Sequence, residues 1–102
     1  MVLMEFSLFP LDKGVSLSHY VARSLRIVEQ SGLDYRLTAM GTIVEGELPQ
    51  VLDVMKQCLE AMASDCDRVS CSAKLDYRSG DQRRLEAKVQ SVEAKVGHTL
   101  RK

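Results

Sequence analysis

The sequence lacks tryptophan, has only two prolines and two phenylalanines among 102 residues, and shows no excess of charge of either sign. Its 14 basic and 14 acidic side chains cancel, so no overall field steers the chain to nucleic acid or to an anionic membrane. A basic N-terminal region, a long apolar run and a signal cleavage site are also missing. We therefore expect a cytoplasmic protein that binds neither nucleic acid nor a membrane.

Cysteine is scarce as well, and its spacing excludes the usual cysteine chemistry. Cys58, Cys66 and Cys71 form no Cys-x-x-Cys pair, and neither His19 nor His98 lies near them in the sequence. Such cysteines are typically small buried apolar side chains in a reducing compartment. The pattern predicts no metal site.

Signatures of catalysis are also missing. The histidines have no evident serine or cysteine partner with which to form a nucleophile and base. Gly41 and Gly46 fit neither a dinucleotide-binding glycine motif nor a phosphate-binding loop. We expect that the protein is not an enzyme and uses no cofactor.

The length is typical of one domain, so residues 1–102 are predicted to share a single core. Residues 2–9 alternate between apolar and other side chains, which predicts a strand with one buried face that ends at Pro10. A helix follows, with an N-cap at Ser16 and an end at Ser31-Gly32. Its broad inward stripe consists of Leu17, Tyr20, Val21, Ser24, Leu25, Ile27 and Val28.

The middle of the chain predicts more extended structure. Residues 35–40 alternate, with Tyr35 and Leu37 on one face, and residues 42–45 continue after Gly41. They form either two strands joined at the corner Met40-Gly41-Thr42 or one long strand with a bulge there. Pro49 then fits the first turn of a second helix, whose apolar positions are Leu48, Leu52, Met55, Leu59 and Met62.

The last third predicts one strand and one helix. Residues 68–77 alternate regularly, with Val69, Cys71, Ala73, Leu75 and Tyr77 facing inward. Asp81 is expected to cap a third helix over 82–96. Its narrow apolar stripe resembles a helix–helix seam more than a face that covers a core. The stripe consists of Leu85, Val89, Val92 and Val96.

The order of elements is β-α-β-β-α-β followed by a C-terminal helix, which predicts an α+β, ferredoxin-like fold with a four-stranded antiparallel sheet. Two helices cover only one face of such a sheet. The other face mixes large apolar side chains with hydroxyls and charges, which suits a protein interface or a small polar ligand. We expect two subunits to pair through it and the third helix to make a second contact, giving a dimer of dimers. This face is predicted to carry Leu3, Glu5, Ser7, Phe9, Thr38, Met40, Ser70, Ser72 and Lys74.

The chain resembles the family of small thiamine-binding proteins. The resemblance rests on Ser-Leu-Ser-His-Tyr-Val-Ala at 16–22, Ser-Gly-Leu-Asp-Tyr-Arg-Leu at 31–37 and Met-Gly-Thr-Ile-Val-Glu-Gly-Glu at 40–47, with shorter matches at 68–69, 76–78 and 88–93. It departs from the pattern at Ala39, where relatives often have proline, and at Val15. The resemblance implies a homo-oligomer, usually a tetramer, that binds thiamine or its hydroxymethylpyrimidine moiety in thiamine handling or transport.

Thiamine needs a flat apolar contact, hydrogen-bond partners for its aminopyrimidine and a site that tolerates the cationic thiazolium. Glu5 would balance the cation or accept from the amino group, unless it pairs with Lys74 across the sheet. Serines would bond to ring nitrogens, unless they are merely hydrated. Thr42 lies in the family motif beside Gly41, and Met40 would form a wall or pack at an interface. The candidate ligand-binding residues are Glu5, Ser7, Tyr20, Met40, Thr42, Ser70 and Ser72.

Three other functions share this topology. A regulatory domain that senses amino acids would bind a different ligand. A purely structural oligomeric adaptor would use the mixed face only as an interface and bind no small molecule. A metal chaperone would need paired cysteines near the first helix, and residues 12–18 contain none.

Overall fold

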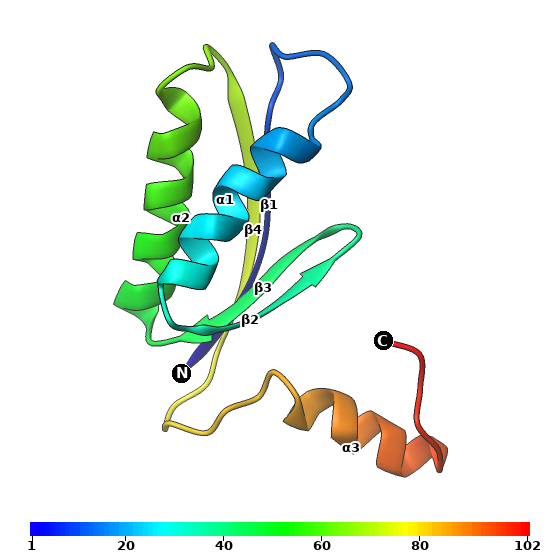
Figure 1. The fold of residues 1–102 in the computed structure, drawn as a ribbon. Helices are drawn as coiled ribbons and strands as arrows, with labels where there is room; N and C mark the ends of the chain where they lie inside the picture. The colour runs from blue at the N-terminus through cyan, green and yellow to red at the C-terminus, as the bar shows by residue number, and fades with distance from the viewer.

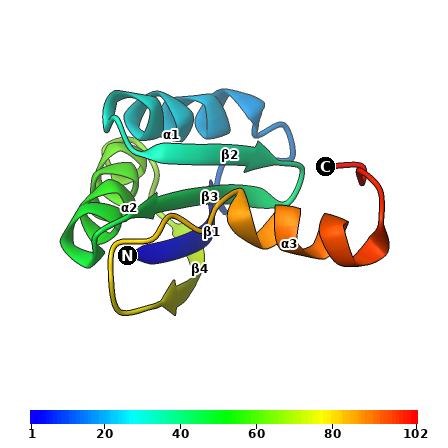
Figure 2. The same ribbon diagram turned by 90° about the horizontal axis from the view of Figure 1, so that it is seen from below.

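The computed structural model describes residues 1–102, and its architecture confirms the predicted α+β, ferredoxin-like order. Four antiparallel strands form one sheet in the order β2-β3-β1-β4. Helices α1 and α2 cover one face of the sheet, whereas α3 stands apart from both (Figures 1 and 2). The elements are β1 (Val2–Pro10), α1 (Ser18–Gln30), β2 (Asp34–Thr38), β3 (Gly41–Gly46), α2 (Leu48–Ala63), β4 (Val69–Tyr77) and α3 (Ala87–Val96).

The core lies between the sheet and the first two helices. Alternate residues of β1 point into it, as the sequence predicted, because successive side chains of a strand face opposite sides. Each such side chain contributes about 1.5–3 kcal/mol when it is fully buried. The core residues are Val2, Met4, Phe6, Leu8, Val28, Val44, Val51, Val54, Cys58, Met62 and Cys66.

Of the three helix starts predicted from the sequence, only that of α2 agrees with the structure. Pro49 lies in the first turn of α2, and Glu47 and Gln50 form a capping box there. The predicted N-cap at Ser16 is wrong, since α1 follows Leu17 and no side chain caps it. Ser16 lies one residue too early for its hydroxyl to reach the first free amides of the helix.

The prediction of a third helix over 82–96 capped by Asp81 is also wrong at its start. Helix α3 begins only at Ala87. The backbone N–H groups of Arg84 and Leu85 donate to the carboxylate of Glu45, and the bond from Leu85 is 3.2 Å long. These contacts hold the segment before Ala87 on the sheet, so it cannot wind into the helix.

Residues 35–45 form two strands, which settles the alternative left open by the sequence. The turn lies at Ala39-Met40, slightly before the predicted corner, because β2 ends at Thr38 and β3 begins at Gly41. The Thr38 hydroxyl donates to the Gly41 carbonyl at 2.9 Å and accepts from the Met40 N–H at 3.3 Å. This hydroxyl closes the turn.

The edge strands are less covered than predicted. Leu75 and Tyr77 of β4 lie on the helix side of the sheet but are 40% and 69% exposed. Tyr35 and Leu37 of β2 are on the same side and are also exposed. Two helices are too narrow to cover the outer halves of both edge strands.

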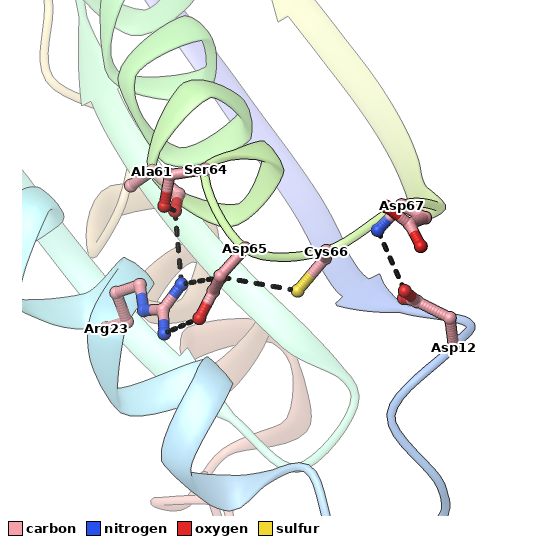
Figure 3. Close-up of polar contacts among 7 residues, drawn as sticks. All are labelled: Asp12, Arg23, Ala61, Ser64, Asp65, Cys66 and Asp67. Atoms are coloured by element: carbon pink, nitrogen blue, oxygen red, sulfur yellow. Dashed lines mark hydrogen bonds and ion pairs between the residues drawn. The ribbon is translucent and has the colours of Figure 1, made fainter.

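A polar clasp joins α1 to the loop after α2 (Figure 3). Arg23 donates to both carboxylate oxygens of Asp65, at 2.6 and 2.9 Å, and to the Ala61 carbonyl at 3.1 Å. Beside it, the Asp67 N–H donates to the Asp12 carboxylate at 2.8 Å.

None of the three helices is long and apolar enough to cross a membrane.

Candidate functional site

The uncovered face of the sheet brings several predicted ligand residues together on β1 and β4. In the strand register Glu5 is opposite Lys74, Ser7 is opposite Ser72, and Phe9 is opposite Ser70. All of them point away from α1 and α2, as predicted. We refer to this side of the sheet as the open face.

A shallow hollow of about 420 Å³ lies on the open face and contains four of the seven candidates. Glu5 and Lys74 face each other across it, but no ion pair within 4.0 Å joins them. The carboxylate of Glu5 is therefore available to a cationic ligand. The candidates in this hollow are Glu5, Ser7, Met40 and Ser72.

Met40 occupies another place than the sequence indicated, and Thr42 lies apart from the open face. Thr42 pairs with Phe6, and its side chain is on the helix side of the sheet, where it is only 5% exposed. Met40 lies in the β2–β3 turn and is 87% exposed, so it belongs to no strand face. The open face therefore does not include Thr42, and Met40 borders it from the turn.

Thr42 lines a second cavity, of about 200 Å³, between α1, the end of β1 and the β2–β3 turn. Most of its wall is apolar, from Phe6, Leu8, Val21 and Leu37 among others. Such a wall suits the face of a flat ring. We call this space the hairpin cavity.

Ser24 adds a buried hydroxyl to the hairpin cavity. It lies on α1, is 5% exposed, and its Oγ has no hydrogen-bond partner. A buried hydroxyl without a partner costs about 1–3 kcal/mol. A ligand group that bonded to it would recover this cost. One feature of the sequence points to this residue, since it is a serine within the apolar stripe of the helix.

The hairpin cavity and the open-face hollow adjoin. Both are lined by Phe6, Ser7 and Met40. The cause is the register, since β3 pairs with β1 only as far as Phe6 opposite Thr42. Beyond this pair β1 has no neighbour on that side, and the tip of the hairpin borders both spaces.

Two of the seven candidates lie outside both spaces. Ser70 is on the open face but does not line the hollow. The ring of Tyr20 meets the ring of His19 edge-on at 4.7 Å, and the guanidinium carbon of Arg23 lies 5.2 Å from its centre. These contacts tie Tyr20 to the surface of α1.

Glu45, within the motif at 40–47, is buried although it lies next to the end of β3. It is 3% exposed on the open-face side and accepts hydrogen bonds from the segment that leads to α3. Its neighbours hold the same segment, through ion pairs between Arg36 and Glu86 at 2.8 Å and between Arg83 and Asp34 at 2.5 Å. Glu45 therefore positions residues 84–85, which lead into α3 and which we call the root of α3.

The cysteines offer no reactive thiolate. All three are free, and burial raises the pKa of each thiol, for Cys58 to about 11. A thiol with such a pKa stays protonated near neutral pH and is a poor nucleophile. No group of three or more His, Cys, Asp or Glu side chains is arranged to hold a metal ion.

Known proteins of similar sequence include a UPF0045 protein of Methanocaldococcus jannaschii, 34% identical over 91 residues that cover 89% of this chain and 91% of the relative. A UPF0045 protein of Mycobacterium bovis is 37% identical over 93 residues, which cover 90% of this chain and 91% of the relative. The crystal structure of the Methanocaldococcus protein superimposes with a TM-score of 0.83, over 89% of this chain and 94% of that one.

A second solved structure, a domain of unknown function from Bacillus cereus, is 34% identical with a TM-score of 0.78, over 88% of each chain. A protein of Thermotoga maritima with a proposed role in thiamine biosynthesis or salvage has a TM-score of 0.78 at 22% identity, covering 89% of this chain and 97% of that one, and supports the fold. Residues 4–93 match the family model described as thiamine-binding protein. The chain therefore belongs to the thiamine-binding protein family, as the motifs at 16–22 and 40–47 indicated.

Proposed function

We propose that the protein is a non-catalytic, cytoplasmic binder of thiamine or its hydroxymethylpyrimidine moiety, that it works as a homo-oligomer, and that it serves thiamine handling or transport. Its family is named for thiamine binding, and the related Thermotoga maritima protein has a proposed role in thiamine biosynthesis or salvage. One structural observation carries the proposal. An apolar cavity with a buried, unpaired hydroxyl adjoins a polar hollow with an unpaired carboxylate.

This pair of spaces suits a ligand with one neutral ring and one cationic ring. The hairpin cavity, at about 200 Å³, is smaller than the roughly 300–1,000 Å³ of sites for drug-sized ligands, so it suits a single ring. There Ser24 and Thr42 would hydrogen-bond to the aminopyrimidine. The thiazolium would extend into the open-face hollow, where Glu5 balances its charge.

The open-face hollow is bounded by the sheet on one side and is open to solvent on the other. Leu3 and Phe9 of the same face are partly exposed apolar residues, which a second subunit would cover. We propose that pairing through this face encloses the thiazolium half of the ligand, with Ser70 at the contact. A dimer of dimers, giving a tetramer, completes the proposal.

Isothermal titration with thiamine and with hydroxymethylpyrimidine tests the proposed site. Loss of one hydrogen bond costs about 0.5–1.5 kcal/mol, so Ser24→Ala and Thr42→Val should each weaken the binding of both ligands several-fold. Glu5→Gln should weaken the binding of thiamine but leave the affinity for the uncharged hydroxymethylpyrimidine unchanged. Ser91→Ala, an exposed serine on α3, is the matched control and should bind as the wild type does.

The same titrations separate the alternatives. If Ser24→Ala, Thr42→Val and Glu5→Gln all bind with wild-type affinity, these residues are not part of the ligand site. Binding of an amino acid in place of thiamine would indicate a regulatory domain, and no binding of any small molecule would indicate a structural adaptor. A ligand present at 100 times its dissociation constant stabilises a protein by about 2.7 kcal/mol, so thermal unfolding provides a second readout.

A further inference from the structure

A third cavity, of about 390 Å³, lies between strands β2 and β3 and the segment that leads into α3. This segment follows β4 and returns to the sheet before the helix begins (Figures 1 and 2). The volume falls within the roughly 300–1,000 Å³ of sites that hold small molecules. No residue that lines this cavity also lines the hairpin cavity or the open-face hollow. We call this space the root cavity.

Glu45 is the one buried residue in the wall of the root cavity. Its Oε2 accepts both backbone hydrogen bonds from Arg84 and Leu85, whereas its Oε1 accepts none and is not sealed from solvent. No ion pair within 4.0 Å involves this carboxylate, and Arg84 does not line the cavity. Each oxygen of an ionised carboxylate has about two acceptor positions. Those of Oε1 are therefore free and open onto the root cavity.

The other charges of the root cavity compensate one another. Arg83 pairs with Asp34 at 2.5 Å, and Arg36 pairs with Glu86 at 2.8 Å. All four of these side chains are partly exposed and line the cavity. The carboxylate of Glu45 therefore leaves one negative charge without a counter-charge, at the most buried position. A buried charge costs free energy unless a partner compensates it, and a cationic ligand would be such a partner.

The surroundings of Glu45 select one kind of cation. A guanidinium donates in parallel to both oxygens of a carboxylate, but Oε2 is already occupied by two backbone N–H groups. A metal ion needs several ligands, and no group of three or more His, Cys, Asp or Glu side chains is arranged to hold one. A primary ammonium is a compact charge that needs only one free oxygen. Leu85 and Ala87 add apolar surface to the wall, which suits a short carbon chain.

We propose that the root cavity binds a small organic amine through its primary ammonium group. The ammonium donates to Oε1 of Glu45, and the carbon chain lies against Leu85 and Ala87. Because the lining residues come from β2, β3 and the segment before α3, the bound amine bridges the sheet and the root of α3. This site is separate from the proposed thiamine site and does not depend on it.

The test uses n-butylammonium as the probe and NMR shifts of the Arg84 and Leu85 amides as the readout. n-Butylammonium should shift both amides saturably, with a dissociation constant on the order of 1 mM for a ligand of so few atoms. n-Butanol lacks the charge and n-butylguanidinium needs two free oxygens, so each should bind at least about tenfold more weakly. Bound n-butylammonium should also slow hydrogen exchange at the two amides, because it bridges their segment to the sheet.

Three full-length variants locate the probe. Glu45→Gln removes the charge and should weaken the binding of n-butylammonium at least about tenfold. Ala87→Leu leaves the carboxylate in place but fills part of the cavity, so it should weaken binding several-fold even if Glu45→Gln releases the root of α3. Glu29→Gln is the matched control, since Glu29 is exposed on α1 and has no ion-pair partner. It should bind n-butylammonium as the wild type does.

Competition with thiamine separates this site from the proposed thiamine site. Thiamine should not displace n-butylammonium, and Ser24→Ala should bind n-butylammonium with wild-type affinity, because Ser24 does not line the root cavity. If thiamine displaces n-butylammonium and Glu45→Gln loses the binding of both, the root cavity holds the vitamin and the separate amine site is refuted. Binding of n-butylammonium without any binding of thiamine would support the amine site and refute only the proposed function.

Three further results would overturn the proposal. The first is an absence of saturable shifts with n-butylammonium, or equal shifts with n-butanol, which would mean that the charge of Glu45 attracts no ammonium. The second is tighter binding of n-butylguanidinium than of n-butylammonium, which would contradict the selection by a single free oxygen. The third is wild-type affinity for n-butylammonium in both Glu45→Gln and Ala87→Leu, which would place the probe elsewhere.

Discussion

Asp65 accepts hydrogen bonds from both terminal nitrogens of Arg23, so that a single guanidinium binds both oxygens of the carboxylate, at 2.6 and 2.9 Å. The pair joins α1 to the loop between α2 and β4 (Figure 3). The hydrogen bonds from Arg23 lower the pKa of Asp65 to about 2, and the same contact raises the pKa of Arg23.

Arg23→Gln should return the pKa of Asp65 toward its ordinary value of 3.8. Since the folded-state pKa is lowered, the pair stabilises the fold above pH 3.8, and this contribution disappears as the pH falls toward 2. The variant should lose the part of the pH dependence of stability in that range. Carboxyl NMR titration measures the pKa directly, and an unchanged value in Arg23→Gln would show that another group is responsible. The effect on stability is small because water screens the exposed pair.

Ser24→Ala should not destabilise the ligand-free protein, and we expect it to raise the free energy of unfolding by up to about 1 kcal/mol. The buried Oγ has no partner to lose, and removing it also removes the cost of keeping it from water. Urea denaturation measures the change. Combined with weaker ligand binding, this result would mark Ser24 as a residue kept for binding at the expense of stability.

Ser31→Ala is the control for that experiment. Its hydroxyl donates to the Val28 carbonyl at 2.5 Å and accepts from the Leu33 N–H at 3.2 Å. The loss of these bonds should lower the free energy of unfolding by about 0.5–1.5 kcal/mol. Equal destabilisation in Ser24→Ala and Ser31→Ala would show that the Ser24 hydroxyl is satisfied in solution.

Gly41→Ala should destabilise the protein by about 1–3 kcal/mol, because an added side chain is forced against the backbone. A Cβ atom at Gly41 would lie 3.0 Å from the carbonyl oxygen of Phe6. The β2–β3 turn would have to move away from β1, which would change both spaces lined by Phe6. Thermal unfolding should show the loss, whereas Met40→Ala at the exposed tip should stay within about 0.5 kcal/mol of the wild type. Equal stability of the two variants would contradict the close approach.

Glu45→Ala should release the root of α3 and lower the free energy of unfolding by about 1–3 kcal/mol, since two backbone N–H groups lose their acceptor. Glu45→Gln keeps one acceptor oxygen and should have a smaller effect. Hydrogen exchange at the amides of Arg84 and Leu85 reports the change locally. Unaltered protection of these amides in Glu45→Ala would mean that the ion pairs at Arg36 and Arg83 hold the segment alone.

The local sequence pattern predicted an element correctly where contacts of its own residues determine its structure. The alternation of residues 2–9 and the apolar stripe of α2 predicted their elements because each buries one regular face. The local pattern gave a wrong prediction where a distant residue binds the backbone amides. Residues 82–86 were predicted to be helical, but Glu45, some 40 positions earlier, accepts hydrogen bonds from the amides of Arg84 and Leu85. Nothing within a helical period of that segment indicates this contact.

The candidate site was predicted in part for the same reason. Strand alternation placed Glu5, Ser7 and Ser72 on one face, because neighbouring residues of a strand point to opposite sides. Thr42 and Ser24 could not be assigned to a common cavity. The position where the hairpin leaves β1 depends on the pairing of Phe6 with Thr42, which neither segment specifies alone.

The sequence by itself determined the fold, the family and which residues of β1 and β4 face away from the first two helices, since periodicity and motifs are local properties of the chain. The tertiary structure alone decided that Ser24, Met40 and Thr42 border one cavity, that Glu45 fixes the start of α3, and that α3 projects from the domain with its valines uncovered. These outcomes depend on strand register and on contacts between segments that are far apart in the sequence. Such relations arise only when the sheet has assembled.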